Sequence, residues 1–374
     1  MDPIDTPGTS PLRHSALHDR HVALGAKLAE FGGWEMPLEY VGVVKEHTAV
    51  REAVGVFDVS HLGKVVVHGP GAAEFVNSCL TNDLRRIEPG KAQYTLCCDP
   101  DSGGIVDDLI AYLHSDERVL LVPNAANTAE VVRMLDAEVP DGVEIDDLHE
   151  TLSILAVQGP KSDEVLAAIG FPVGHDYMSF AEAEHDGAPV VVCRTGYTGE
   201  RGYELVVPNE VVGSLWDALM AAGEPYGITP CGLGARDTLR TEMGYPLHGQ
   251  DITRQVTPNE ARLGWAVGWK KEAFWGRSAL VAERETGPKR VLRGLVANGR
   301  AIPRPGMRVL LVADVPVGQV TSGTFSPTRK LGVGLAVIAS QVTEGAEVSV
   351  DVRGRREIFT VTKPPFVTPG VRED

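Results

Sequence analysis

Gly103-Gly104-Ile105-Val106-Asp107-Asp108-Leu109-Ile110-Ala111-Tyr112 is the stretch around which the chain is organised. Its two glycines favour a turn, and the apolar, β-favouring run after them predicts a strand that carries two adjacent carboxylates. Side chains alternate between the two faces of a strand, so Asp107 and Asp108 point in opposite directions and do not form a paired-acid dyad. Asp108 shares its face with apolar and aromatic residues, where a carboxylate is costly to bury without a partner. From this stretch alone, Asp108 is either a turn-stabilising residue or a reactive group.

The flanking sequence predicts an α+β fold around this strand. Residues 91–97 read as a strand that leads through a polar turn into the glycine pair, so the two strands are expected to form a hairpin. Strands, helices and hairpins alternate further along the chain, which favours antiparallel sheets over a doubly wound parallel sheet. From residue 287, short strands follow at about ten-residue spacing, as in a small β-barrel or sandwich. We therefore expect a catalytic region at 12–286 and a C-terminal barrel at 287–370.

Composition excludes several classes of partner. The chain carries 35 basic and 51 acidic residues, a net charge of −16, which disfavours non-specific binding to nucleic acid or to an anionic membrane. No apolar run approaches the ~20 residues that a membrane span needs. Residues 1–11 are polar and resemble neither a signal peptide nor a transit peptide, so a cytoplasmic protein is expected. The five cysteines are odd in number and lack a Cys-x-x-Cys pair, which indicates unpaired thiols in a reducing compartment.

Two further stretches carry candidate functional groups. Glu204 lies between apolar neighbours on a strand that follows the glycine-rich turn 196–202, and the alternative interpretation is a solvated surface carboxylate. Arg236 falls near the start of a predicted helix in the stretch 231–240, where it could instead be an exposed residue paired with a nearby acid. The glycines of that stretch follow the pattern Gly-x-Gly-x-x-Asp, which lacks the third glycine and the preceding strand of a dinucleotide fingerprint.

Three histidines near the N-terminus raise the possibility of a metal site. Apolar residues recur at helical spacing over residues 16–31, although Gly25 could break such a helix. A helix would bring His14, His18 and His21 to one side, and imidazoles are good ligands. No carboxylate stands at a matching spacing, so we expect no metal here.

Six motifs in series resemble a known family. They occur in the order Phe31-Gly-Gly-Trp-Glu-Met-Pro37, Phe57-Asp-Val-Ser-His61, Gly104-Ile-Val-Asp-Asp-Leu109, Thr195-Gly-Tyr-Thr-Gly-Glu200, Gly232-Leu-Gly-Ala-Arg-Asp237 and Thr321-Ser-Gly-Thr-Phe-Ser-Pro327. Together they resemble the aminomethyltransferases (T-proteins) of the glycine cleavage system, over about residues 17–366. Each motif is weak alone, but six in this order and spacing are specific.

The resemblance implies a three-domain cloverleaf, with two intertwined α+β folate-binding domains and a C-terminal β-barrel. It implies transfer of the methylene of the aminomethyl group, carried on the dihydrolipoyl arm of the lipoylated H-protein, to tetrahydrofolate. Ammonia and 5,10-methylenetetrahydrofolate are the products. H-proteins are usually acidic, so Lys289, Arg290 and Arg293 are candidate docking residues on this acidic chain. A monomer without a metal is expected.

The resemblance also assigns residues. Asp108 takes the position of the family's essential carboxylate, and Glu204 that of its pterin-binding glutamate. A pterin offers an N–H and an amino group side by side, which a carboxylate accepts together. The remaining folate-binding positions are Arg236, Tyr94, Tyr112, Asn124 and Tyr197.

The main alternative is a non-catalytic folate-binding paralogue that assists iron–sulfur assembly. Members of that group carry a cysteine motif, and the matching stretch here, residues 271–277, has no cysteine. One departure from the T-protein pattern is the C-terminal segment 363–367, which lacks the tyrosine that some relatives have.

Overall fold

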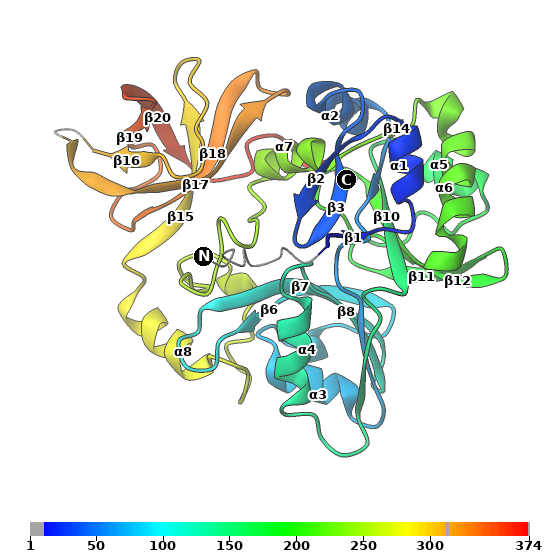
Figure 1. Ribbon diagram of the computed structural model, residues 1–374. Helices are drawn as coiled ribbons and strands as arrows, with labels where there is room; N and C mark the ends of the chain where they lie inside the picture. The colour runs from blue at the N-terminus through cyan, green and yellow to red at the C-terminus, as the bar shows by residue number, and fades with distance from the viewer. Residues whose placement is uncertain (1–10, 312–313, 373–374) are drawn as a thin grey trace, which may run out of the picture.

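The computed structural model describes residues 11–311 and 314–372. Three lobes surround the central helix α7 (Leu233–Met243), as Figure 1 shows. The predicted α+β architecture with a C-terminal barrel is confirmed. Within residues 11–311, single-turn 3-10 helices lie at Leu84–Arg86, Glu224–Tyr226 and Gly264–Ala266. Among the described residues, none of the helices combines the length and apolar character required to cross a membrane. All five cysteines are buried and unbridged, as predicted.

The first lobe contains the Asp108 hairpin in a five-stranded sheet. Its strands, in spatial order, are β6 (Lys91–Cys98), β7 (Ile105–Ser115), β8 (Arg118–Val122), β5 (Val65–His68) and β9 (Glu144–Asp147). Helices α3 (Ala72–Cys79) and α4 (Thr128–Asp136) cover one face and bury an aliphatic core against it. The alternation of small and aliphatic residues on β7 supplies the other side of that core.

The second lobe is a six-stranded sheet that the chain enters twice. Its strands, in spatial order, are β11 (Phe180–His185), β12 (Ala188–Cys193), β13 (Gly202–Pro208), β10 (Leu152–Gln158), β4 (Gly55–Asp58) and β14 (Thr229–Pro230). Helices α5 (Ser162–Ala168) and α6 (Asn209–Gly223) cover its outer face. Because β4 precedes the whole first lobe and β10 follows it, the two lobes are intertwined, as predicted.

The inner faces of these two sheets pack against each other. Tyr112 of β7 and Val206 of β13 belong to one shared apolar cluster, which also includes Leu239 of α7. Side chains two residues apart on a strand share a face, so Asp108 and Glu204 point toward the same layer between the sheets. The layer therefore brings together two carboxylates that lie far apart in the sequence.

The third lobe is a closed barrel that begins at Arg290. Its strands, around the barrel, are β15 (Arg290–Ala297), β18 (Leu331–Ala339), β17 (Pro316–Ser326), β16 (Arg308–Leu310), β19 (Glu347–Val352) and β20 (Arg355–Thr362). Helix α8 (Arg277–Thr286) precedes it. The predicted strand at 307–312 reaches residues outside the described part of the chain. The domain division between residues 286 and 287 remains a prediction, and it falls between the end of α8 and the start of β15.

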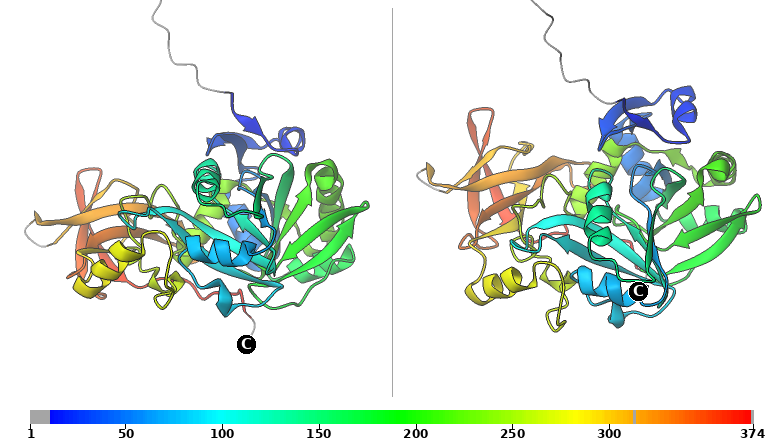
Figure 2. Two further views of the ribbon diagram at one scale, coloured as in Figure 1. Left: turned by 90° about the horizontal axis from the view of Figure 1, so that it is seen from below. Right: turned by 60° about the horizontal axis from the view of Figure 1, so that its bottom comes forward.

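A small N-terminal subdomain lies on one face of the three lobes, as the left view of Figure 2 shows. It comprises β1 (Arg13–His14), α1 (His18–Ala23), β2 (Lys27–Phe31), β3 (Trp34–Glu39) and α2 (Val43–Glu52). Of the two alternatives for residues 16–31, the helix broken at Gly25 is the one that the structure shows. Gly25 adopts a positive φ of 73° just after α1, a conformation that ends helices, and residues 27–31 pair with β3 instead.

Two buried acid–arginine networks connect α7 and the loop after it to the barrel. Glu242, at the end of α7, accepts hydrogen bonds from Arg51 of α2 at 2.8 Å and from the Thr328 hydroxyl at 2.9 Å. Asp251 accepts from Arg240 at 2.8 Å and from Ser322 at 2.7 Å. The hydroxyl-rich motif at 321–327 thus orients the barrel against the catalytic lobes.

The segment after β20 returns from the barrel to the second lobe. The Phe366 amide donates to the Glu242 carbonyl at 2.8 Å, and the Gly370 amide donates to the Gly199 carbonyl at 2.7 Å. Arg194 donates to the Val371 carbonyl at 2.9 Å. This segment passes along the face opposite the N-terminal subdomain in the left view of Figure 2.

Candidate functional site

The glycine turn and the hairpin place Asp108 at the inner layer. A Cβ on Gly104 would stand 1.9 Å from the Arg254 carbonyl oxygen, so only glycine permits this contact with the 250–256 loop. In the hairpin register, Leu96 is opposite Asp108 and Tyr94 is opposite Ile110. Tyr94 is therefore a diagonal neighbour on the same face, and its hydroxyl donates to Asp108 Oδ2 at 3.0 Å.

Asn124, just beyond the end of β8, holds both carboxylates of the pair. Its Nδ2 donates to Asp108 Oδ1 at 2.9 Å and to Asp107 Oδ1 at 2.8 Å. Asp107 also accepts from the Asn124 backbone amide at 2.9 Å and from Asn127 Nδ2 at 2.7 Å. Asp107 is fully buried whereas Asp108 is partly exposed. Asp107 therefore positions Asn124 from behind, and Asp108 is the carboxylate presented to the site.

The protein environment raises the pKa of both Asp107 and Asp108. Burial and the charge of Asp108 raise the pKa of Asp107 to about 8, although the N–H donors of Asn124 and Asn127 oppose the rise. Burial also raises the pKa of Asp108, opposed by His248 and by the Tyr94 and Asn124 hydrogen bonds. Burial therefore disfavours the charged form of both acids, whereas the donors around Asp108 favour the charged form of that carboxylate.

Glu204 comes from the facing sheet with a buried support behind it. Thr195 donates to Glu204 Oε2 at 2.6 Å, and the Tyr112 hydroxyl lies 2.9 Å from Thr195 Oγ1. Tyr112 itself is only 2% exposed. It therefore stands behind Thr195 and orients Glu204 through it, whereas Glu204 is partly exposed at the layer.

Tyr197 and Arg236 form a stacked pair that interacts electrostatically with the two carboxylates. The Arg236 guanidinium stacks over the Tyr197 ring, 4.7 Å from its centroid. Burial raises the pKa of the Tyr197 phenol, Asp108 adds to the rise, and Arg240 and Arg236 oppose it. Burial lowers the pKa of Arg236, and Glu204 opposes that shift. Asp108 and Glu204 thus both face the layer between the two sheets, and each interacts electrostatically with one member of the Tyr197–Arg236 pair.

One donor of Arg236 has no partner among the described residues. Its Nη1 is buried and makes no hydrogen bond. A buried unpaired N–H of a charged group costs about 1–3 kcal/mol or more. The site is therefore built to receive an acceptor oxygen or nitrogen beside Tyr197, which fits a pterin carbonyl or a glutamyl carboxylate.

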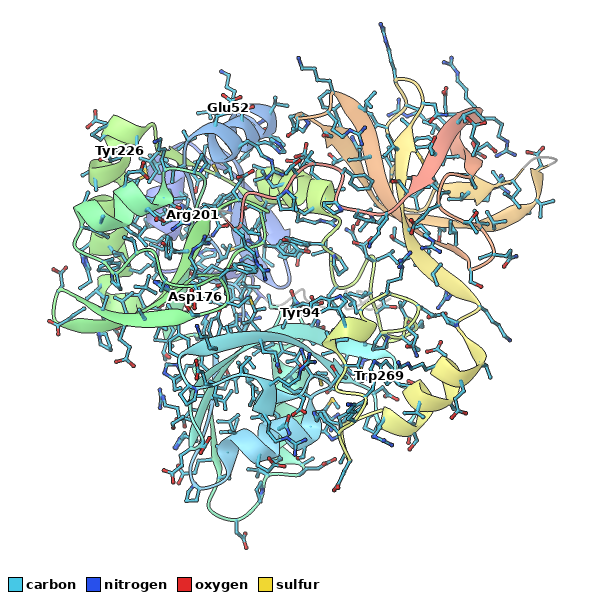
Figure 3. All side chains as sticks on the ribbon, turned by 180° about the vertical axis from the view of Figure 1, so that it is seen from behind. Glu52, Tyr94, Asp176, Arg201, Tyr226 and Trp269 are labelled. Carbon is cyan, nitrogen blue, oxygen red and sulfur yellow. The ribbon has the colours of Figure 1, made fainter. Side chains whose placement is uncertain are left out.

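Direct contacts join the seven predicted site residues in three sets: Asp108 with Tyr94 and Asn124, Tyr197 with Arg236, and Glu204 with Tyr112 through Thr195. Residues not predicted from the sequence also belong here. The Trp265 indole stacks on Tyr94 with ring centroids 5.3 Å apart and is 63% exposed. Tyr94 is labelled in Figure 3, on the sheet edge that faces the middle of the three lobes. Asn127 and His248 are hydrogen-bonded at 2.9 Å behind Asp107.

Comparison with known proteins agrees with this arrangement. Residues 17–271 match the model of the GCVT N-terminal domain, and residues 290–368 match that of the glycine cleavage T-protein C-terminal barrel domain. The chain belongs to the glycine cleavage T-protein family. The predicted resemblance is therefore confirmed over nearly the whole sequence.

Individual T-protein relatives extend over almost the full length. The chain is 64% identical to an aminomethyltransferase of Frankia alni, over 95% of this chain and 98% of that protein. It is 59% identical to an aminomethyltransferase of Mycobacterium tuberculosis strain H37Rv, over 96% and 98%. The crystal structure of the glycine cleavage system aminomethyltransferase T from Bartonella henselae superposes with a TM-score of 0.90 at 34% identity, over 96% and 99% of the two chains. The fold around the site is thus a T-protein fold.

Proposed function

We propose that this T-protein is an aminomethyltransferase that transfers the methylene of the aminomethyl-dihydrolipoyl group of H-protein to tetrahydrofolate. The observation that carries the proposal is that Asp108 and Glu204 face the layer between the two sheets, where Arg236, stacked on Tyr197, keeps one buried donor for a ligand. The non-catalytic alternative gains no support, because this chain retains Asp108 with its hydrogen-bonded donors.

Glu204, Arg236 and the aromatic rings are the groups that would bind the folate. Glu204, fixed by Thr195, can accept two N–H groups of a pterin side by side. Arg236 Nη1 can donate to the pterin carbonyl or to a carboxylate of the glutamyl tail. Tyr94 and Trp265 offer flat faces against which the folate can pack.

Asp108 is the group that would assist the chemistry. In the overall reaction the methylene exchanges its bonds to sulfur and nitrogen for bonds to two folate nitrogens, and the thiol and ammonia take up the two displaced protons. Asp108 can accept a hydrogen bond from a folate N–H and stabilise positive charge at the carbon as sulfur leaves. Tyr94 and Asn124 hold the carboxylate in place for both tasks.

A direct assay tests the proposed function. The protein is mixed with aminomethylated H-protein and tetrahydrofolate, and ammonia and 5,10-methylenetetrahydrofolate are measured. Both products should appear in equal amounts. Folate binding without either product would instead identify a binding module.

Replacing Glu204 with Gln should weaken tetrahydrofolate binding about 10–100-fold, because a hydrogen bond to a charged group contributes about 1.5–3 kcal/mol. The amide oxygen of Gln can still accept from Thr195, so folding should be unaffected. Calorimetric titration with tetrahydrofolate under anaerobic conditions measures the change. Glu184→Gln, at an exposed position of β11, is the matched control. Equal affinities of the two variants would remove Glu204 from the site.

We further propose that H-protein docks beside the barrel. A groove of about 390 Å³ lies between the 250–256 loop and the barrel, and Lys289 and Arg290 line it. Arg290 is already paired with Glu260 at 2.7 Å, whereas Lys289 is exposed. The chain itself has a net charge of −16, which would repel an acidic partner. Basic side chains at the edge of this groove would instead attract such a partner locally.

Replacing Lys289 with Glu should raise the KM for H-protein roughly two- to tenfold, as expected for reversing one rim charge. The affinity for tetrahydrofolate should not change. Steady-state kinetics at low and high salt provide the measurement, because a charge effect shrinks with ionic strength. Lys45→Glu, at an exposed position of α2, is the control, and identical KM values for both variants would contradict the docking site. A cytoplasmic location and a monomeric state remain predictions.

A further inference from the structure

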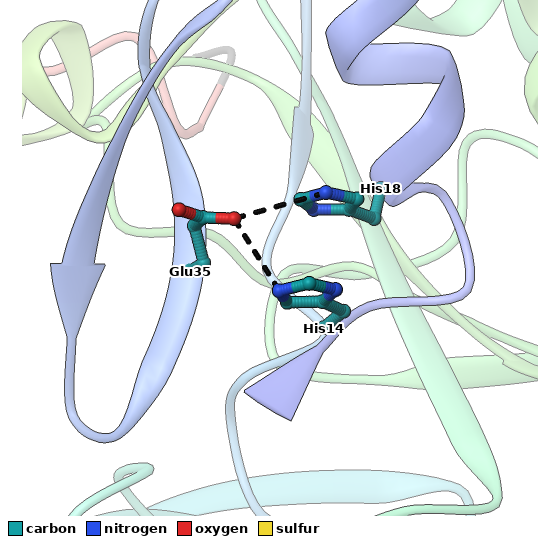
Figure 4. Close-up of side chains that lie close together, drawn as sticks. All are labelled: His14, His18 and Glu35. Atoms are coloured by element: carbon teal, nitrogen blue, oxygen red, sulfur yellow. Dashed lines mark ion pairs between the residues drawn. The ribbon is translucent and has the colours of Figure 1, made fainter. Parts of the chain in front are cut away.

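His14, His18 and Glu35 form a cluster on the N-terminal subdomain. His14 Nε2 lies 3.3 Å and His18 Nε2 lies 3.7 Å from Glu35 Oε2. Figure 4 shows both rings directed at this one carboxylate oxygen. One ligand atom from each of these three residues lies within 4.8 Å of the other two. Among the described residues, no other group of three or more His, Cys, Asp or Glu side chains meets this criterion.

The backbone fixes this cluster. β1 and β3 pair in parallel with His14 in register with Glu35, so the two side chains stand next to each other on one face. Arg13 and Trp34 form the neighbouring register pair and point to the other face, which keeps the Arg13 cation away.

The turn between the two histidines is fixed as well. Ser15 is buried and donates to Asp58 at 2.6 Å, and its carbonyl accepts from the His18 amide at 3.0 Å. Leu17 is fully buried, which anchors the start of α1. His18 is therefore brought back over His14 by structure that does not depend on a bound ion.

The cluster does not include His21, although the sequence pattern placed it with the other two. His21 is buried and contacts Asp58 at 2.8 Å and the Tyr40 hydroxyl at 2.9 Å. The carboxylate that the local sequence lacked comes instead from β3.

Two imidazoles and one carboxylate are the ligands of many zinc sites with an open position. Ligand atoms about 2.0–2.2 Å from a tetrahedral ion are about 3.3–3.6 Å apart, close to the spacings of Glu35 Oε2 from the two histidines. The His14 and His18 rings are stacked 3.8 Å apart at an angle of 5°. Lone pairs of parallel rings do not converge, so the rings must splay by side-chain rotation to bind one ion.

His18 also carries an unused polar atom. Its Nδ1 is buried and has no hydrogen-bond partner among the described residues. The contacts within the cluster leave His18 Nδ1 without a hydrogen-bond partner. Rotation of the His18 ring toward an ion would move this nitrogen out of its present environment.

We propose that His14, His18 and Glu35 form a Zn²⁺ site that fastens β1 and α1 to β3. The ion is held by two imidazole nitrogens and one carboxylate oxygen, with water in the remaining position. Its task is structural, because none of the three residues contacts Asp108, Glu204 or their hydrogen-bond partners. The site is thus independent of the proposed transferase chemistry.

Calorimetric titration of the full, untagged chain with ZnCl₂ tests the proposal. One ion per chain should bind, and MgCl₂ should not compete, because Mg²⁺ prefers oxygen ligands in octahedral geometry. His14→Ala, His18→Ala and Glu35→Gln should each weaken zinc binding at least about tenfold, because each removes one of only three protein ligands. X-ray absorption of the zinc-loaded protein should show nitrogen and oxygen ligands at about 2.0–2.2 Å.

His68→Ala is the matched control. His68 lies 3.0 Å from Asp146 on the surface and so offers a histidine–carboxylate contact without a second imidazole. This variant should bind zinc like the unmodified chain. Zinc binding that persists with unchanged stoichiometry and affinity in the His14→Ala/His18→Ala double variant overturns the proposal, as does the absence of any 1:1 binding. Loss of binding in the histidine variants but not in Glu35→Gln overturns the three-ligand site.

Discussion

Replacing Asp108 with Asn should slow methylene transfer by about 10²–10⁴-fold while the protein still folds and binds tetrahydrofolate. Asn matches Asp in size, and its carbonyl oxygen can still accept from Asn124 Nδ2. Its amide can donate to the Tyr94 hydroxyl, which then accepts where it previously donated. The substitution therefore removes the charge and keeps the hydrogen bonds, so a lower rate reports on the charge itself. Single-turnover kinetics with aminomethylated H-protein measure the effect.

Two comparisons make the Asp108 result specific. Asp101→Asn, at an exposed position of the turn before β7, should leave the rate unchanged. Tetrahydrofolate affinity should be similar in all three proteins, since Glu204 and Arg236 are unaltered. A wild-type rate for Asp108→Asn would assign Asp108 to the structural role that its turn position also allows.

Replacing Glu242 with Ala should lower the free energy of unfolding by about 3–5 kcal/mol, the usual cost of removing one partner of a buried ion pair. Glu242 is fully buried, and its carboxylate accepts from Arg51, Thr328 and Ser326. Without it, Arg51 keeps Glu200 as a partner at 2.7 Å and the Leu239 carbonyl of α7 at 3.4 Å, but loses its ion pair with α7. The barrel and the N-terminal subdomain then lose a shared anchor. Urea unfolding followed by fluorescence and circular dichroism measures the change.

The Glu242 contribution should also depend on pH. Burial raises its pKa, but the His47 hydrogen bond and charge, the Ser326 hydrogen bond and the Arg51 charge lower it to about 2. A depressed carboxyl pKa contributes stability that is present above the ordinary value of about 4.5 and is lost as the pH falls toward 2. The loss of stability between pH 4.5 and pH 2 should therefore be shallower in Glu242→Ala. Glu285→Ala, on the exposed side of α8, should match the unmodified protein at every pH, and a Glu242→Ala profile equal to it would rule out this anchor.

The local part of the fold was accessible from sequence because short-range rules decide it. Side-chain alternation separated Asp107 from Asp108, and the structure places them as expected, with one buried and one presented to the site. The barrel strands followed from their turn spacing. The strand at residues 27–31 was not predicted because it depends on pairing with β3, which the helical spacing of residues 16–31 does not encode.

The sequence pattern singled out Asp108 as a candidate, and the family resemblance assigned roles to the other predicted site residues. Trp265 lies in a single-turn 3-10 helix and His248 in a loop, and both were missed because neither segment has a periodic pattern and only tertiary packing brings them to Tyr94 and Asp107. The pair Asn124 and Asn127, three residues apart after a strand, was a signal that could have indicated a shared acceptor. Tyr112 was predicted to line the site, but its hydroxyl is hydrogen-bonded to Thr195 Oγ1, in the layer behind Glu204.

The returning C-terminal segment affects how the protein is made in the cell. The turn that carries Tyr197 takes a backbone partner from Gly370, and Glu242 takes one from Phe366. A ribosome releases both partners long after the two intertwined lobes have emerged. Nascent chains therefore lack these two backbone contacts until the segment after the barrel has emerged. A ribosome that stalls within the barrel should leave a chain whose first two lobes are compact but lack the contacts of the C-terminal segment. We expect chaperones and proteases to recognise such a chain.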